Sequence, residues 1–227
     1  MISHLLNLFF PKACLGCEQF LLANEAVICT QCRHNIPLTN QHLHFDNEAM
    51  TKFYGRIPLE HISSLMYFHK KGIVQELIHN LKYRGHQEVG TLIGNWYGTE
   101  LQNCETLKTI DAIIPIPLHK RKYRKRGYNQ VTTFGETLSK QLNCPFDETI
   151  LERIQYSKTQ TFKNLLGRNE IKAHTFQAHF NESHHNKHYL LIDDVITTGA
   201  TLEAAGKALL AIPGIKISIV CMAMSQS

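Results

Sequence analysis

The chain has 227 residues, of which 43% are hydrophobic and 19% charged, and its formal net charge is +5 at pH 7. These values exclude a disordered or fibrous protein, and the length suits one α/β core with a small additional module. The net charge is modest, so the placement of the basic residues tells more about partners than their total does.

The apolar N-terminus, Met1 to Phe10, has neither the basic flank nor the small-residue cleavage site of a signal peptide. It is also too short to span a bilayer, and no later segment of the sequence approaches the length of a transmembrane helix. We therefore expect a cytoplasmic protein without membrane insertion.

Two CxxC pairs, separated by eleven residues, contain four of the seven cysteines: Cys14, Cys17, Cys29 and Cys32. Disulfides are rare in the cytoplasm, and each pair can present two thiolates to one side. A redox dithiol normally stands alone at the start of a helix, so two pairs argue against that role. The spacing favours a closed structural zinc site in which four protein ligands leave no position for water or substrate.

A polar connector follows the cysteines, so residues 1–45 are predicted to form a zinc-finger module and residues 46–227 the main domain. Apolar runs predict strands at residues 65–68, 110–116, 149–154, 189–192 and 217–223. Helical spacing of apolar residues predicts helices around residues 73–81, 89–97, 131–142 and 202–210. This alternation indicates an α/β fold with a doubly wound, mostly parallel sheet.

Lys82, Tyr83 and Arg84 stand at the end of the first of these helices. Cations at this position interact favourably with the helix dipole, and a contact with a phosphate explains them equally well. Cationic and aromatic residues together would also suit a single-stranded nucleic acid.

A dense run of cations follows the strand predicted at residues 110–116. Six of the seven residues from Lys120 to Arg126 are Lys or Arg. Such runs are most often solvated surfaces, and nucleic-acid contacts are the next most common explanation. Because this run follows the carboxyl end of a strand, it can also hold an anion at the edge where parallel sheets bind ligands. We expect one or two of the cations, Lys120 and above all Arg126, to do so.

The segment from Tyr189 to Thr201 combines a buried strand with two acids, Asp193 and Asp194, placed where that strand should end. A turn rich in hydroxyl groups then leads into a helix and contains Thr197, Thr198, Gly199, Ala200 and Thr201. Amides and hydroxyls at a helix start bind phosphate, and carboxylates accept hydrogen bonds from sugar hydroxyls. A capped helix start alone would explain one acid and one threonine, but not the whole segment. We therefore predict a sugar-phosphate site.

Residues 189–201 resemble the motif with which type I phosphoribosyltransferases bind 5-phosphoribosyl 1-pyrophosphate (PRPP). The chain as a whole resembles the ComF family, competence-associated proteins related to amidophosphoribosyltransferases. The segments that carry this resemblance are the two CxxC pairs and residues 81–85, 114–118, 126–130 and 193–201. The resemblance implies a type I phosphoribosyltransferase fold with an N-terminal zinc finger, in which residues 46–109 supply the hood and first helices and residues 110–227 the PRPP-binding core.

The resemblance also implies that PRPP binds with Mg²⁺. Asp193 and Asp194 are then the catalytic acids that hold the ribose, and residues 197–201 bind the 5′-phosphate. The residues expected to bind pyrophosphate are Lys120, Arg126, Lys158 and Arg168. The last two belong to a polar stretch, residues 156–172, that we expect to act as a lid, although Gly167 and Ile171 replace the acid and asparagine of typical members.

Two functions fit these expectations. The first is transfer of the phosphoribosyl group to an unidentified acceptor with release of pyrophosphate, linked to competence and DNA uptake. The alternative is a non-catalytic PRPP sensor that binds single-stranded DNA as an accessory of the uptake machinery. A scaffold protein also stays open, in which the zinc module and the sheet surfaces serve a partner such as a competence helicase and the sugar-phosphate pocket is inert. The sequence leaves the acceptor and the oligomeric state open.

Overall fold

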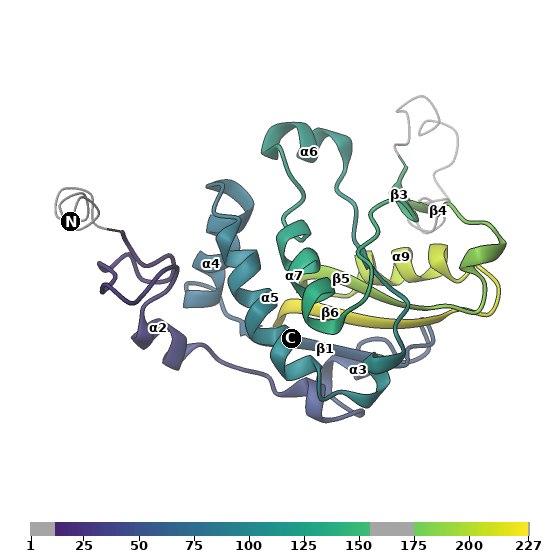
Figure 1. Ribbon diagram of the computed structural model, residues 1–227, viewed down its shortest axis with the longest axis horizontal. Helices are drawn as coiled ribbons and strands as arrows, with labels where there is room; N and C mark the ends of the chain where they lie inside the picture. The colour runs from purple at the N-terminus through teal and green to yellow at the C-terminus, as the bar shows by residue number, and fades with distance from the viewer. Residues whose placement is uncertain (1–11, 155–174, 227) are drawn as a thin grey trace, which may run out of the picture.

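The structure, a computed structural model, describes residues 12–154 and 175–226. Its centre is a four-stranded sheet with the order β1–β6–β5–β2, in which all neighbouring strands are parallel (Figure 1). These strands are β1 (His61–Phe68), β2 (Ala112–Pro115), β5 (His188–Ile196) and β6 (Lys216–Ser225). A separate antiparallel pair is formed by β3 (Leu151–Arg153) and β4 (Phe176–Ala178).

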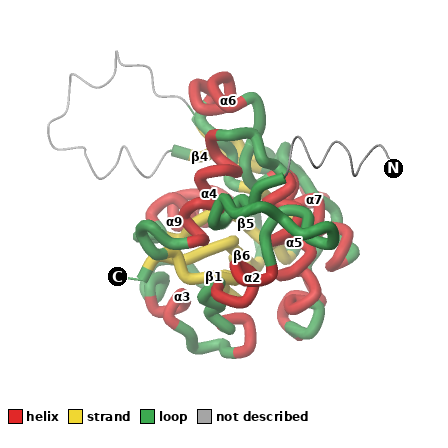
Figure 2. The backbone as a smooth tube through the Cα atoms, turned by 90° about the vertical axis from the view of Figure 1, so that its left-hand side faces the viewer, coloured by secondary structure: helices red, strands yellow, loops and turns green. Residues whose placement is uncertain are grey.

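Helices cover both faces of the central sheet (Figure 2). One face packs against α4 (Ile73–Tyr83), α5 (Glu88–Leu101) and α7 (Thr132–Leu142), and the other against α3 (Glu48–Thr51) and α9 (Ala200–Leu209). In β5, Leu190 and Ile192 belong to the first apolar core and Leu191 to the second. Parallel strands buried on both faces are expected to consist of such continuous apolar runs. The predicted α/β class with a doubly wound sheet is thereby confirmed.

The N-terminal part contains α2 (Thr30–Asn35) and the short 3₁₀ helix η1 (Gln41–Leu43). Between them, the chain pairs antiparallel with the free edge of β1 through a bridge from Leu38 to Met66. The connector expected to be merely polar is in fact anchored to the same strand. The amide of Ser64 donates to the buried side chain of Gln41, and Asn47 donates to the carbonyl of Ile62.

The remaining helical segments are η2 (Glu105–Thr109), α6 (Lys120–Arg126) and η4 (Glu182–His184). In the described part of the chain, no helix combines the length and apolar character required to cross a membrane.

Two predicted strands differ from the observed elements, and the basic run, for which no element was predicted, forms a helix. The strand predicted at residues 149–154 is β3, which lies outside the central sheet. The basic run forms the helix α6, which is capped by the side chain of His119 and ends at Gly127 in a left-handed conformation with φ of 82°. The central strand β5 does not end at Ile192 but continues to Ile196 because β6 continues to pair with it as far as Met224. Both acids therefore lie within the strand.

Candidate functional site

The two adjacent acids of β5 point in different directions. Successive side chains of a strand alternate between the two faces of the sheet, so Asp193 and Asp194 diverge. Asp194 is 5% exposed and lies on the side of α4 and α7, where it bonds to Lys82 and Gln130. Asp193 faces the turn that follows β5. That both acids hold the ribose hydroxyls, directly or through a metal-bound water, stays a prediction.

Asp193 and the turn after β5 line one shallow hollow of about 20 Å³. The turn residues that share this lining are Thr197, Gly199, Ala200 and Thr201. Gly199 precedes the first residue of α9 with φ of 75°, a left-handed conformation that favours glycine. The first amides of a helix lack partners within it, and the helix dipole favours an anion there. The hollow therefore places a carboxylate beside amide and hydroxyl donors.

Phe53 and Arg56, which follow α3, support this turn and were not predicted from the sequence. The Arg56 guanidinium donates to the carbonyl of Thr198 at 2.8 Å and lies 3.7 Å from the Glu203 carboxylate. The ring of buried Phe53 fills the space beside Gly199, where an added Cβ would lie 2.8 Å from its Cζ atom. No local pattern could have indicated these contacts, because they join segments more than 140 residues apart in the chain.

The environment of Asp193 disfavours its charged form. Burial, followed by the negative charge of Asp194, raises the pKa of the Asp193 carboxyl from 3.8 to about 7. The amide of Asp194, which donates to Asp193 Oδ1 at 2.8 Å, and the cations Lys82 and Arg153 act in the opposite direction. A hydroxyl or cation that enters the hollow would add to this stabilisation of the charged form.

Asp194 is held from two sides by neighbouring donors. Lys82 Nζ lies 2.7 Å from Oδ1, and Gln130 Nε2 lies 2.5 Å from Oδ2. Gln130 in turn accepts a hydrogen bond from the guanidinium of Arg126. The end of α4 is tied to the same region because Tyr128 donates its hydroxyl to the carbonyl of Leu81. Lys82 thus has a carboxylate partner, which none of the explanations offered from the sequence anticipated.

A larger pocket of about 270 Å³ opens between the end of α4 and α6. The residues that line this basic pocket are Lys82, Tyr83, Gly85, Lys122, Lys125, Arg126 and Tyr128. The guanidinium of Arg126 lies 5.4 Å from the centre of the Tyr83 ring. Cations beside aromatic rings suit a ligand that carries phosphate groups, with or without a base.

The structure separates the residues predicted to bind pyrophosphate. Arg126 lines the basic pocket, whereas the Lys120 ammonium lies 3.8 Å from Glu152 of β3 and is not part of the lining. Lys158 and Arg168, together with the predicted lid, lie outside the described residues. Lys122 and Lys125, which lie on the same helix as Arg126, also line the pocket, although the sequence analysis singled out neither of them.

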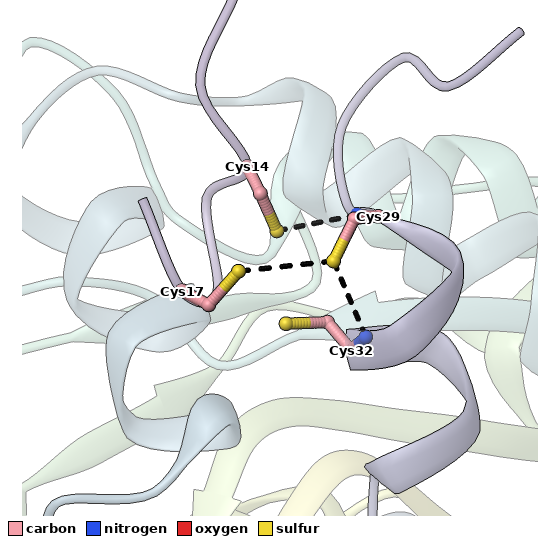
Figure 3. A group of neighbouring side chains, drawn as sticks. All are labelled: Cys14, Cys17, Cys29 and Cys32. Atoms are coloured by element: carbon pink, nitrogen blue, oxygen red, sulfur yellow. Dashed lines mark hydrogen bonds between the residues drawn. The ribbon is translucent and has the colours of Figure 1, made fainter. Parts of the chain in front are cut away.

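The four N-terminal cysteines form one compact cluster (Figure 3). The sulfur atoms of Cys14, Cys17, Cys29 and Cys32 all lie within 4.8 Å of one another. Cys14 Sγ accepts the amides of Cys29 at 3.2 Å and Gly16 at 3.4 Å. Burial alone would raise the pKa of the Cys14 thiol, but these amide donors lower it to about 7. The cluster could hold a metal ion, and its four thiols fit the tetrahedral sulfur set that zinc prefers.

Residues 132–226 match the phosphoribosyl transferase domain. The matched segment contains α7, β5, the turn at Gly199, α9 and β6, and the predicted type I phosphoribosyltransferase fold is confirmed. The cysteine cluster, Lys82 and the basic helix α6 lie outside the match.

Three relatives extend the comparison. The chain is 27% identical over 149 residues to DNA utilization protein YhgH of Escherichia coli O157:H7, and the match covers 64% of this chain and 65% of that protein. It is 34% identical over 111 residues to competence protein F of Haemophilus influenzae, which covers 48% of each chain. It is 26% identical over 200 residues to competence protein ComFC of Bacillus subtilis, which covers 88% of this chain and 78% of the relative.

These relatives confirm the resemblance to the ComF family. The match to ComFC extends over most of the chain, whereas the YhgH match leaves about a third of that relative's length without a counterpart. The ligands and activities of these relatives can therefore only be proposed for this chain.

Proposed function

We propose that this chain binds PRPP with Mg²⁺ and transfers the phosphoribosyl group to an acceptor, with release of pyrophosphate, as part of DNA handling in competence. The phosphoribosyl transferase domain supports a ligand of the PRPP class. The names of the relatives, which refer to competence and DNA utilization, support the cellular role.

The observation that carries this proposal is the shared hollow of Asp193 and Gly199. A sugar phosphate needs carboxylate acceptors for its hydroxyls and amide donors for its phosphate, side by side. The hollow offers both at the carboxyl end of a central strand, where parallel sheets bind ligands. In the proposed reaction, residues 197–201 hold the 5′-phosphate and Asp193 accepts hydrogen bonds from the ribose. A carboxylate near the sugar also stabilises the positive charge that develops as pyrophosphate departs.

The basic pocket is the proposed place for the pyrophosphate. Arg126, Lys122 and Lys125 line it and can stabilise the negative charge of the leaving group. Mg²⁺, which prefers phosphate oxygens and water as ligands, would neutralise part of the same charge when it is bound. Lys158 and Arg168 are proposed to join this pocket from the lid, and Lys120 would first have to leave Glu152.

Calorimetric titration of PRPP with Mg²⁺ tests the sugar-phosphate site. Asp193→Asn is expected to weaken PRPP binding at least tenfold, because hydrogen bonds to a charged acceptor are worth about 1.5–3 kcal/mol each. Glu136→Gln, which removes an equal charge from an exposed position on α7, is the matched control and should bind like the wild type. Equal affinity of Asp193→Asn and the control would refute the site.

Pyrophosphate release separates catalysis from sensing. The wild-type protein is incubated with PRPP, Mg²⁺ and a panel of nucleobases, amines and single-stranded DNA. Release that depends on one acceptor identifies a transferase and its substrate class. PRPP binding without release for any member of the panel would instead favour the sensor.

One observation specifically favours the second candidate, a PRPP sensor that binds single-stranded DNA. No residue of the basic helix α6 is buried, and both views show it standing away from the central sheet (Figures 1 and 2). Tyr83 and Tyr123 are 65% and 52% exposed and can stack on bases beside the cations. A steep loss of oligonucleotide affinity with added salt would support this candidate.

We further propose that the cysteine cluster holds one structural zinc ion and, with residues 1–45, forms the zinc-finger module. The four sulfur atoms fit that ion in number and spacing. Cys14 and Cys32 also belong to the same apolar core as Leu77 of α4, so metal binding would stabilise the packing of the module on the main domain.

A further inference from the structure

Lys82 lies between the buried, negatively charged Asp194 and the basic pocket, which is positively charged. Its ammonium group contacts the buried carboxylate of Asp194 at 2.7 Å, and the same side chain lines the basic pocket. The Lys82 side chain is 22% exposed and that of Asp194 only 8%. The carboxylate is therefore the inner member of the pair, and the ammonium is the member that a ligand in the pocket can reach.

The basic pocket contains more positive than negative charge. It is lined by four cations, Lys82, Lys122, Lys125 and Arg126. Within residues 12–154 and 175–226, no ion-pair partner is recorded for Lys122 or Lys125, and Arg126 has only the neutral acceptor Gln130 and the Tyr83 ring. Among the described residues, Lys82 is the one of these four cations with a carboxylate partner. An anion that enters the pocket thus meets three cations without an ion pair to any described residue, and a fourth that Asp194 already holds.

An ammonium group has three N–H donors, and one of those of Lys82 is used by Asp194. A multiply charged anion attracts Lys82 more strongly than the single carboxylate does, and the pair lies in a region where Coulomb interactions are weakly screened. When Lys82 moves to the anion, Gln130 is the one side-chain donor that Asp194 keeps among the described residues. A buried carboxylate that loses a cation needs a replacement donor.

We propose that Asp194 is the resident counter-ion of Lys82, and that an anion entering the basic pocket draws Lys82 away from it. Lys82 is then a further anion-binding residue, and Asp194 becomes free to accept a hydrogen bond from a ligand hydroxyl. The exchange favours ligands that bring an anion and a hydroxyl together. The identification of that ligand as PRPP rests on the proposed function, whereas the exchange of Lys82 between two anions does not.

The test uses inorganic pyrophosphate as the probe and measures its affinity by calorimetry. Lys82→Gln removes a donor to the anion and is expected to weaken binding about tenfold or more. Asp194→Asn removes the competing anion and is expected to strengthen binding about tenfold, the opposite sign to that of a residue that merely supports the pocket. Lys140→Gln, which removes one positive charge from an exposed position on α7, is the control and should change the affinity by less than about twofold.

The double variant decides whether the two residues act through each other. In the Lys82→Gln background, Asp194→Asn should lose most of its effect, because the carboxylate then has no lysine to withhold. Additive effects, or an Asp194→Asn variant that binds pyrophosphate no better than wild type, would overturn the inference.

A measurement on the wild-type protein avoids any dependence on how well the Asp194 variant folds. The ¹⁵Nζ resonance of Lys82, identified by its loss in Lys82→Arg, should shift when the pocket is saturated with pyrophosphate. An unchanged resonance, or no pyrophosphate binding at all, overturns the exchange. Failure of PRPP to bind while pyrophosphate moves Lys82 would instead refute the proposed function and leave the exchange standing.

Discussion

The conformation of the turn between β5 and α9 can be tested most directly by substitution of Gly199. Gly199→Ala has two separate costs in this structure. An L-residue at φ of 75° is strained, which costs about 1–2 kcal/mol. The new Cβ would also lie 2.8 Å from Cζ of Phe53, and overpacking of a buried contact costs about 1–3 kcal/mol.

The two costs add up to about 2–5 kcal/mol of unfolding free energy. For a chain of this size, each kcal/mol lowers Tm by about 2–4 °C, so a loss near the middle of that range corresponds to about 7–14 °C. Gly55→Ala is the matched control, because Gly55 has a similar φ of 71° but no atom within 4 Å of the added Cβ. The control should therefore lose only about 1–2 kcal/mol.

Calorimetric melting of Gly199→Ala, Gly55→Ala and wild type measures the difference that Phe53 causes. Phe53→Leu removes the ring atoms nearest to Gly199, so the Gly199→Ala and Phe53→Leu changes should be less than additive in destabilisation. Equal melting temperatures of the two alanine variants, or strict additivity with Phe53→Leu, would refute the assigned contact.

Three further predictions address charge and metal binding. The pKa of Asp193 is raised in the folded state, so the folded protein binds more protons than the unfolded chain between about pH 4 and pH 7. The free energy of unfolding should therefore fall as the pH rises through that window. In urea melts at several pH values, Asp193→Asn should flatten this dependence. Purified protein should contain one zinc ion per chain by elemental analysis, and Cys14→Ser should lose it and melt earlier while Cys104→Ser, outside the cluster, keeps it. If α6 binds single-stranded DNA, each of Lys122→Gln and Lys125→Gln should make the slope of log affinity against log salt shallower by about 0.7, and an unchanged slope would argue against phosphate contacts there.

Much of the fold could be predicted because its signals are local. The buried run before Asp193, the turn at Gly199 and the helix after it occupy about twenty consecutive residues, and their periodicity changes visibly from strand to helix. The two CxxC pairs are equally local, and the structure gathers all four thiols as their spacing indicates. The ends of strands were less predictable. The strand β5 extends through both acids because β6, which comes later in the chain, pairs with it as far as Ile196.

The sequence by itself determined the α/β class, the glycine-containing turn before α9 and the clustering of the four cysteines, since each depends on neighbouring residues and on the period of the chain. Only the tertiary structure decided that Asp193 faces the turn while Asp194 meets Lys82, 112 residues earlier. It also decided that Phe53 and Arg56 support Gly199 and Thr198. The physical reason is that such contacts form when distant helices and strands pack together, and no local pattern of side chains records which of them will meet.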